Sequence, residues 1–233
     1  MIIGGIQKNS FIDFPSKISC VLFTAGCNFD CPYCHNPDLA RRTSTSKVID
    51  LKEIFDFLKK RKSLLDGVVI TGGEPTLQPD LFDFCREIKE LGYPIKIDTN
   101  GTRPKVIQNL LSNHLIDYIA MDVKTSFERY FSVISKNCNP VDLRESVLSI
   151  LQSGVEHEFR TTCVKSIVDA ADIEEISRLI GGANLYALQK VSLENNRVLH
   201  PEYFISRDWR FSAQELESFR TIASVFVKRV VIR

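Results

Sequence analysis

The chain has 233 residues, of which 44% are hydrophobic and 25% charged, a composition typical of an ordinary globular protein with a sizeable core. A formal net charge of +1 gives no electrostatic reason to expect nucleic acid as a partner. No apolar run approaches the ~20 residues of a membrane span, and residues 1–10 lack the pattern of a signal peptide, so we expect a cytoplasmic protein with no membrane partner.

Short apolar or β-branched runs alternate with amphipathic segments along the chain. The runs indicate strands at 18–23, 68–71, 95–98, 118–122, 158–164, 185–191 and 229–232. Helical patterns lie between them, at 51–58, 81–91, 110–115, 141–151, 173–180 and 212–226. Regular alternation of strands and helices favours a parallel α/β sheet.

No Pro-rich or Ser-rich linker divides the chain, so we expect one domain over residues 1–233. The longest stretch without clear periodicity lies near 194–210, and it is either a surface excursion or a lid. Its aromatic residues Tyr203, Phe204 and Trp209 either flank an opening of the domain or pack on the last helix.

Three of the seven cysteines, Cys27, Cys31 and Cys34, share one short segment directly after the first predicted strand. An odd number of cysteines argues against a disulfide framework. Three thiolates facing a common point can bind three irons of a cubane cluster, which leaves the fourth iron open to a small molecule. The spacing therefore predicts a 4Fe–4S cluster that performs chemistry.

A zinc site or a ferredoxin-type cluster is the plainer alternative for these cysteines. A structural zinc ion needs four ligands, and His35 adjoins Cys34 too closely to serve without strain. A ferredoxin cluster needs a fourth cysteine, and none lies nearby in the sequence. The other cysteines are interpreted as buried small hydrophobic residues; they are Cys20, Cys85, Cys138 and Cys163.

The C-x3-C-x2-C spacing, with Tyr33 before the last cysteine, is the signature of the radical S-adenosylmethionine (SAM) superfamily. The fuller string 26–37 resembles the activating enzymes of glycyl-radical proteins, and the opening 5–15 is similar to anaerobic ribonucleoside-triphosphate reductase activating proteins. The resemblance runs to about residue 191. It implies an incomplete (β/α)6 barrel of parallel strands, open on one side, with one 4Fe–4S cluster and SAM at the carboxyl ends of the strands.

The glycine-rich turn 71–75 follows the second predicted strand. The resemblance places Gly72, Gly73 and Glu74 at the amino group of SAM. Glycines let backbone carbonyls approach an ammonium group, and Glu74 either adds complementary charge or fixes the turn. The alternative is a plain strand-to-helix turn.

The third and fourth predicted strands end in Asp98-Thr99 and in Asp122-Val-Lys124. The resemblance implies that Asp98, Thr99 and Asp122 hold a monovalent cation near the SAM carboxylate, with Lys124 close to the reacting centre. A cation between carboxylates is electrostatically sensible. The alternative is that each aspartate caps the helix that follows it.

Three further residues are implied by the resemblance. Arg160, on the fifth predicted strand, is expected to contact the SAM carboxylate, and its alternative partner is a neighbouring carboxylate such as Glu158. Tyr33 is expected beside the adenine and Asn36 near SAM. His35 either packs at the cluster edge or caps the next helix. Gln189 resembles a family glutamine of unassigned role.

The resemblance thus implies a radical SAM oxidoreductase that cleaves SAM reductively and takes a Cα hydrogen from a glycine of a partner, here anaerobic ribonucleotide reductase. A flavodoxin or ferredoxin would supply the electron. Three alternatives stay open: activation of another glycyl-radical enzyme of the pyruvate formate-lyase type, a radical SAM enzyme for a small molecule, and a non-catalytic Fe–S electron carrier.

Overall fold

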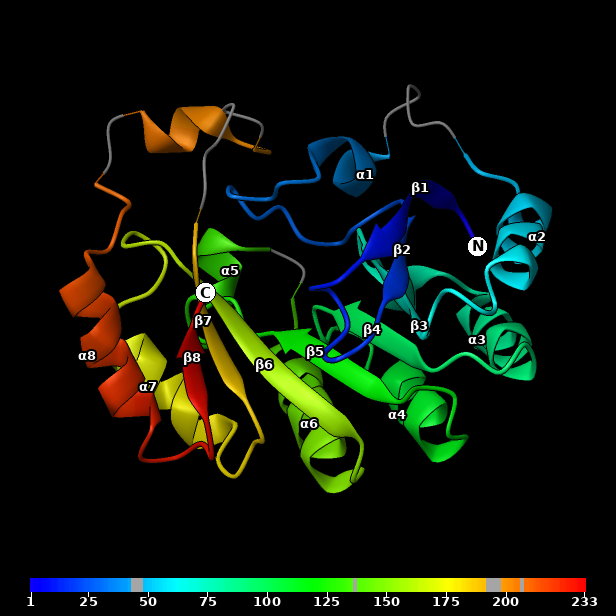
Figure 1. The fold of residues 1–233 in the computed structure, drawn as a ribbon. Helices are drawn as coiled ribbons and strands as arrows, with labels where there is room; N and C mark the ends of the chain where they lie inside the picture. Colours follow the sequence, from blue (N-terminus) through cyan, green and yellow to red (C-terminus); the bar gives the residue numbers. More distant parts are fainter. Residues whose placement is uncertain (43–47, 136–137, 192–197, 206–207) are drawn as a thin grey trace.

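The computed structural model describes residues 1–42, 48–135, 138–191, 198–205 and 208–233. Its centre is one curved sheet of eight strands in chain order (Figure 1). The strands are β1 Ile3–Ser10, β2 Ser19–Thr24, β3 Gly67–Gly72, β4 Ile95–Thr99, β5 Tyr118–Asp122, β6 Glu156–Cys163, β7 Tyr186–Lys190 and β8 Val230–Ile232. From β2 to β8 each strand pairs in parallel with the next.

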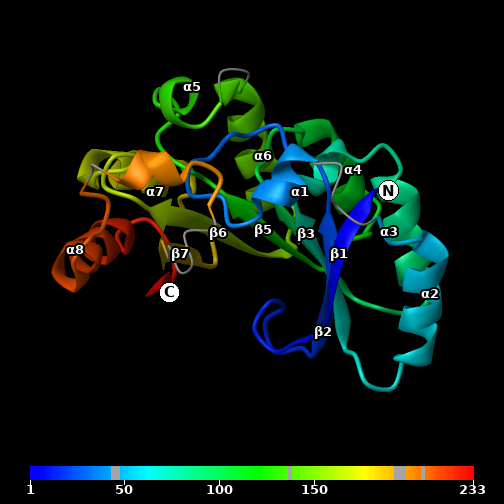
Figure 2. The ribbon, with the colours of Figure 1, turned by 90° about the horizontal axis from the view of Figure 1, so that it is seen from above.

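Helices follow the parallel strands, and most of them lie outside the curved sheet, whereas Pro37–Arg41 lies over the carboxyl ends of the strands (Figure 1 and Figure 2). They are α1 Pro37–Arg41, α2 Leu51–Lys60, α3 Leu81–Glu90, α4 Pro104–Ser112, α5 Tyr130–Val133, α6 Pro140–Gln152, α7 Ala170–Leu179 and α8 Ala213–Ala223, with the short 3-10 helices η1 Pro75–Leu77 and η3 Pro201–Phe204. None of the helices in the described part of the chain is long and apolar enough to cross a membrane.

The sheet does not close into a barrel, because its outer strands β1 and β8 each pair on one side only in the described residues. The predicted incomplete parallel barrel is therefore confirmed. One strand was not predicted: β1 runs antiparallel to β2. Its sequence, IGGIQKNS, is half-buried to exposed over most of its length and has no apolar run, so only its pairing reveals it.

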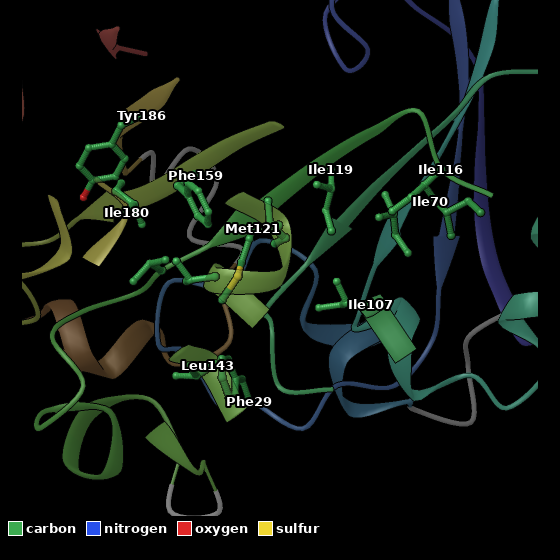
Figure 3. Packing of buried hydrophobic residues seen from close by; sticks show 14 of the residues in the cluster. Phe29, Ile70, Ile107, Ile116, Ile119, Met121, Leu143, Phe159, Ile180 and Tyr186 are labelled. Atoms are coloured by element: carbon green, nitrogen blue, oxygen red, sulfur yellow. The ribbon is translucent and has the colours of Figure 1, made fainter. Parts of the chain in front are cut away.

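The two faces of the sheet differ because side chains alternate along a strand. Outward residues such as Ile70, Ile119 and Phe159 form the main core with the helices (Figure 3). Inward residues form a smaller apolar cluster that includes Val69 and Tyr118. Charged residues share the inner face with this cluster, and they are described with the site below.

The segment near 194–210 crosses the cysteine loop. The backbone N–H of Leu199 donates to the carbonyl of Cys34, and that of His200 donates to the carbonyl of Pro32, at 3.1 Å each. Phe204 is buried and lies edge-on to Tyr203 and Trp209, and all three rings pack against the main core. Residues 194–197 and 206–207 of the predicted segment lie outside the described residues.

Candidate active site

An open cavity of ≈ 480 Å³ lies at the carboxyl ends of the parallel strands. It contains every residue that the sequence analysis predicted for the site. These are Cys27, Cys31, Tyr33, Cys34, Asn36, Gly72, Gly73, Glu74, Asp98, Thr99, Asp122, Lys124 and Arg160. The structure thus brings together segments that are more than a hundred residues apart in the chain.

The cysteine loop leaves β2 through Gly26, whose φ of 98° is in the range that favours glycine. The N–H groups of Gly26 and Cys27 donate to the carbonyls of Leu39 and Ala40 in α1, at 2.7 and 3.1 Å. A further bond of 3.0 Å from the N–H of Cys34 to the carbonyl of Cys31 closes a tight turn. These backbone bonds hold the three sulfurs on one wall of the cavity.

The cysteine set fits an iron–sulfur cluster. The three cysteines belong to one short loop and line the same cavity, as the ligands of one cluster must. Burial raises the pKa of the Cys27 thiol to about 11 and that of Cys31 to about 12, so binding iron must release their protons. The remaining four cysteines do not line this cavity in the described structure.

The glycine turn packs backbone to backbone against the start of the cysteine loop. The N–H of Gly73 donates to the carbonyl of Thr24, and that of Glu74 donates to the carbonyl of Gly26, both at 2.8 Å. A Cβ atom on Gly73 would lie 2.1 Å from the carbonyl oxygen of Gly26. Gly72 has φ 112° and is equally confined. The two glycines therefore keep the turn in contact with the loop that carries the cysteines.

Glu74 is 1% exposed and ties this turn to the end of β4. Its carboxylate accepts bonds from Thr99 Oγ1 and the N–H of Asn100, both at 2.7 Å, and from the N–H and hydroxyl of Thr76. Burial raises the pKa of Glu74, and the bonds from Thr76 and Thr99 act against that rise. Of the two interpretations of Glu74, these contacts favour fixing of the turn.

Asp98 and Asp122 are bridged by Arg160 on the inner face of the sheet. Arg160 Nε lies 2.7 Å from Asp122 Oδ1, and Nη1 lies 3.2 Å from Asp98 Oδ2. Lys124 Nζ lies 2.8 Å from the second oxygen of Asp122. The alternative of an ion pair for Arg160 is therefore observed. The two aspartates are its nearest partners, and Glu158 Oε1 lies farther from Nη1, at 3.9 Å.

Neither aspartate is a helix cap. The N-cap of α4 is Arg103, and that of α5 is Arg129. Burial by itself would raise the pKa of Asp122, but Arg160 and Lys124 lower it well below its usual range. Burial would lower the pKa of Lys124, yet the Asp122 carboxylate raises it above its usual range. Both groups are therefore charged at neutral pH.

The aromatic and amide residues of the loop face the same cavity. Tyr33 is 4% exposed, and its buried hydroxyl has no hydrogen-bond partner in the described structure. Asn36 occupies the N-cap position of α1 but makes no capping bond with its side chain. The helix-cap interpretation of His35 is therefore wrong. Gln189 and His35 also line the cavity.

Two residues beside this site were not predicted from the sequence. Asn100 Nδ2 lies 3.9 Å from Cys27 Sγ and donates to Asn28 Oδ1 at 2.9 Å. Lys96 Nζ lies 2.7 Å from Asp98 Oδ1. Asn100 directly follows Thr99, and Lys96 lies two residues before Asp98 on β4; this closeness in sequence was the only signal for either residue.

The open parallel sheet with three cysteines at its carboxyl edge defines a radical SAM enzyme, and residues 21–180 match the Radical SAM superfamily. The chain is 38% identical, over 100% of its length and 95% of the relative's, to a protein of Methanocaldococcus jannaschii named provisionally as a glycyl-radical enzyme activating enzyme. It is 28% identical to the pyruvate formate-lyase-activating enzyme of Clostridium pasteurianum, over 82% of this chain and 80% of that protein.

Among solved structures, Streptococcus suis SuiB bound to its precursor peptide SuiA shares the fold. The TM-score is 0.70 at 13% identity, over 91% of this chain and 48% of that chain. This chain therefore belongs to the glycyl-radical enzyme activating enzymes of the radical SAM superfamily. Enzymes of this superfamily use a 4Fe–4S cluster and SAM.

Proposed function

We propose that this enzyme cleaves SAM reductively at a 4Fe–4S cluster held by Cys27, Cys31 and Cys34, and that it then removes a Cα hydrogen from a glycine of anaerobic ribonucleotide reductase. The observation that carries the proposal is the lining of the cavity at the carboxyl edge of the sheet. There the three cysteines, the glycine turn and the charged groups of Arg160 and Lys124 surround one space.

When bound, the cluster supplies one electron to the sulfonium of SAM, which breaks the S–C5′ bond and yields methionine and a 5′-deoxyadenosyl radical. The residues of the chain bind and orient SAM. Gly72 and Gly73 allow their backbone carbonyls to approach the SAM amino group. Arg160 donates hydrogen bonds from Nε to Asp122 and from Nη1 to Asp98. Its Nη2 has no protein partner in the described residues, so this nitrogen can donate to the SAM carboxylate.

Tyr33 and Asn36 complete the proposed SAM site. The buried ring of Tyr33, which lines the cavity, supports the adenine side. The amide of Asn36, which makes no capping bond, is available to SAM. Lys124, whose Nζ lies 5.8 Å from the centre of the Tyr33 ring, keeps a positive charge next to the reacting centre.

The radical takes the hydrogen of a glycine Cα, which leaves 5′-deoxyadenosine and a glycyl radical on the partner. The partner is a folded protein, and an unclosed sheet suits a substrate loop of that size. Anaerobic ribonucleotide reductase is chosen over other glycyl-radical enzymes because of the resemblance of residues 5–15. We further propose a cytoplasmic location, with a flavodoxin or ferredoxin as the electron donor.

The test is an anaerobic reaction of three components. The enzyme with its cluster is reduced with dithionite and mixed with SAM and with anaerobic ribonucleotide reductase from the same organism. A glycyl-radical EPR doublet should form on the reductase, with about one 5′-deoxyadenosine per radical. Cys31→Ala is the matched control, and it should give neither product.

A pyruvate formate-lyase type partner is the second candidate, favoured by the 28% identity to the Clostridium pasteurianum protein. The same reaction is therefore run with pyruvate formate-lyase in place of the reductase. A doublet on that enzyme alone would reassign the partner. SAM cleavage with no doublet on either enzyme would favour a small-molecule substrate, and no 5′-deoxyadenosine at all would favour an electron carrier.

A further inference from the structure

Lys96 is a buried lysine beneath the proposed SAM site. It lies on β4 two residues before Asp98, so both side chains point to the inner face of the sheet. Its side chain is 3% exposed, and its Nζ lies 2.7 Å from Asp98 Oδ1 and 5.8 Å from the centre of the Tyr118 ring. A lysine this deeply buried is rare unless it is paired. Asp98 is its partner.

All four carboxylate oxygens of the two site aspartates contact a protein cation. Asp98 Oδ1 faces Lys96 at 2.7 Å, and Asp98 Oδ2 faces Arg160 at 3.2 Å. Asp122 Oδ1 faces Arg160 at 2.7 Å, and Asp122 Oδ2 faces Lys124 at 2.8 Å. Every carboxylate oxygen that would coordinate a dissolved cation is therefore already occupied by a positively charged side chain. Thr99, the third implied ligand, donates its hydroxyl to Glu74 at 2.7 Å and accepts from the N–H of Gly101 at 3.1 Å.

The charges of this group favour an anion over a further cation. Three cations, Lys96, Arg160 and Lys124, surround the carboxylates of Asp98 and Asp122, which leaves one positive charge in excess. Of the other carboxylates near these contacts, Glu158 is paired with Arg233 at 2.8 Å and so adds no net charge. Asp13 lines the same cavity, accepts a hydrogen bond from Ser10 Oγ and contacts none of the three cations in the described residues, so the excess refers to the side chains in direct contact. The single negative charge of a SAM carboxylate would balance the excess. A monovalent cation, as implied by the sequence resemblance, does not fit these residues.

Lys96 lines a different cavity from the one that would hold SAM. Arg160 and Lys124 line the cavity that would hold SAM. Lys96 lines a second cavity of ≈ 480 Å³, and Arg160 belongs to the wall that the two cavities share. Lys96 therefore reaches the site only through Asp98, as a positioning residue.

We propose that Lys96 takes the place of a monovalent cation: it neutralises and orients Asp98, so that this enzyme binds SAM equally well without sodium, potassium or ammonium. The inference rests on the proposed SAM site. It assigns to Lys96 a part in SAM binding that depends on its charge and not on its volume.

The test measures SAM affinity in the enzyme carrying its cluster, by equilibrium dialysis and by the change that SAM makes in the EPR spectrum of the reduced cluster. Choline chloride keeps the ionic strength constant and is replaced in turn by sodium, potassium or ammonium chloride. The wild-type dissociation constant should stay within about twofold across the four salts. Lys96→Met should bind SAM at least about tenfold more weakly in choline and recover most of that loss in sodium or potassium.

Two further variants serve as controls. Lys96→Arg keeps the charge and should behave as wild type in every salt. Lys89→Met removes a lysine that pairs with Asp117 at a partly exposed position on α3, and its SAM affinity should also match wild type.

Three results would overturn the inference. The first is a wild-type enzyme whose affinity for SAM depends on a monovalent cation, a result that needs no variant. A Lys96→Met enzyme that folds but loses affinity equally in every salt would show a purely structural lysine. Absence of SAM binding by the wild type in every salt would remove the proposed function itself, and this inference with it.

Discussion

Replacing Gly73 with alanine places a methyl group where the backbone of the cysteine loop lies. The added Cβ would be 2.1 Å from the carbonyl oxygen of Gly26 and 2.7 Å from its carbonyl carbon. Ordinary contact begins near 3.4 Å, so the two backbones must separate by 3.4 − 2.1 = 1.3 Å. The clash is between backbone atoms, so rotation of a side chain cannot relieve it. The glycine turn 71–75 must therefore move away from Gly26, at the start of the cysteine loop.

The size of the effect follows from that displacement. Overpacking of this kind costs about 1–3 kcal/mol of folding free energy. The N–H···O bonds from Gly73 to Thr24 and from Glu74 to Gly26, both 2.8 Å, are strained by the same movement. A misplacement of ~1 Å between binding groups costs on the order of 100-fold in rate. SAM cleavage should therefore suffer more than stability.

The assay compares urea unfolding with the rate of SAM-dependent 5′-deoxyadenosine formation in enzyme carrying its cluster. Gly73→Ala should lower the unfolding free energy by about 1–3 kcal/mol and the rate by about 100-fold. Gly5→Ala is the matched control, because its Cβ would meet Phe23 at an ordinary 3.6 Å. A Gly73→Ala enzyme that cleaves SAM within about threefold of wild type would refute the reasoning.

Two other predictions concern the cluster and the pH dependence. Cys31→Ala should lose bound iron and all SAM cleavage. Cys85→Ala, at a fully buried position on α3, should keep both and lose about 1–2 kcal/mol of unfolding free energy. Loss of iron from the Cys85 variant would mean that the cluster ligands are misassigned. Burial opposes the ionisation of Asp122, but Arg160 and Lys124 lower its folded-state pKa below the unfolded value of about 3.9, so its stabilising effect is complete above that pH and disappears as the pH falls. Urea unfolding between about pH 3 and 7 should show a steeper acid loss for wild type than for Asp122→Asn, and parallel pH profiles would contradict this.

The motif residues could be predicted because chain connectivity alone brings them together. Each motif follows a parallel strand directly, and the strands lie in the sheet in chain order. The carboxyl ends of such strands meet at one edge, so the glycine turn, Asp98 and Asp122 must meet there as well. For the same reason the cysteine loop, which follows β2, had to face them.

The partners of the charged residues could not be predicted in this way. Asp122 and Arg160 are register partners on β5 and β6, and this pairing explains their contact. The local sequence around either residue does not predict that register. Glu158, the alternative partner named for Arg160, is the nearest carboxylate in sequence, but it lies 3.9 Å from Arg160 and makes its closer contact, at 2.8 Å, with Arg233, 75 residues away.

The sequence by itself determined the family, the order of the parallel strands and the cysteines at their carboxyl edge, because spacing and periodicity along the chain are local properties. The tertiary structure alone decided that β1 completes one edge of the sheet, that Glu74 ties the glycine turn to β4, and that Lys96 neutralises Asp98 from below. Each of these depends on which side chains and strands become neighbours across the curved sheet. Strand register and burial set those neighbours, and neither is written in any one segment of the chain.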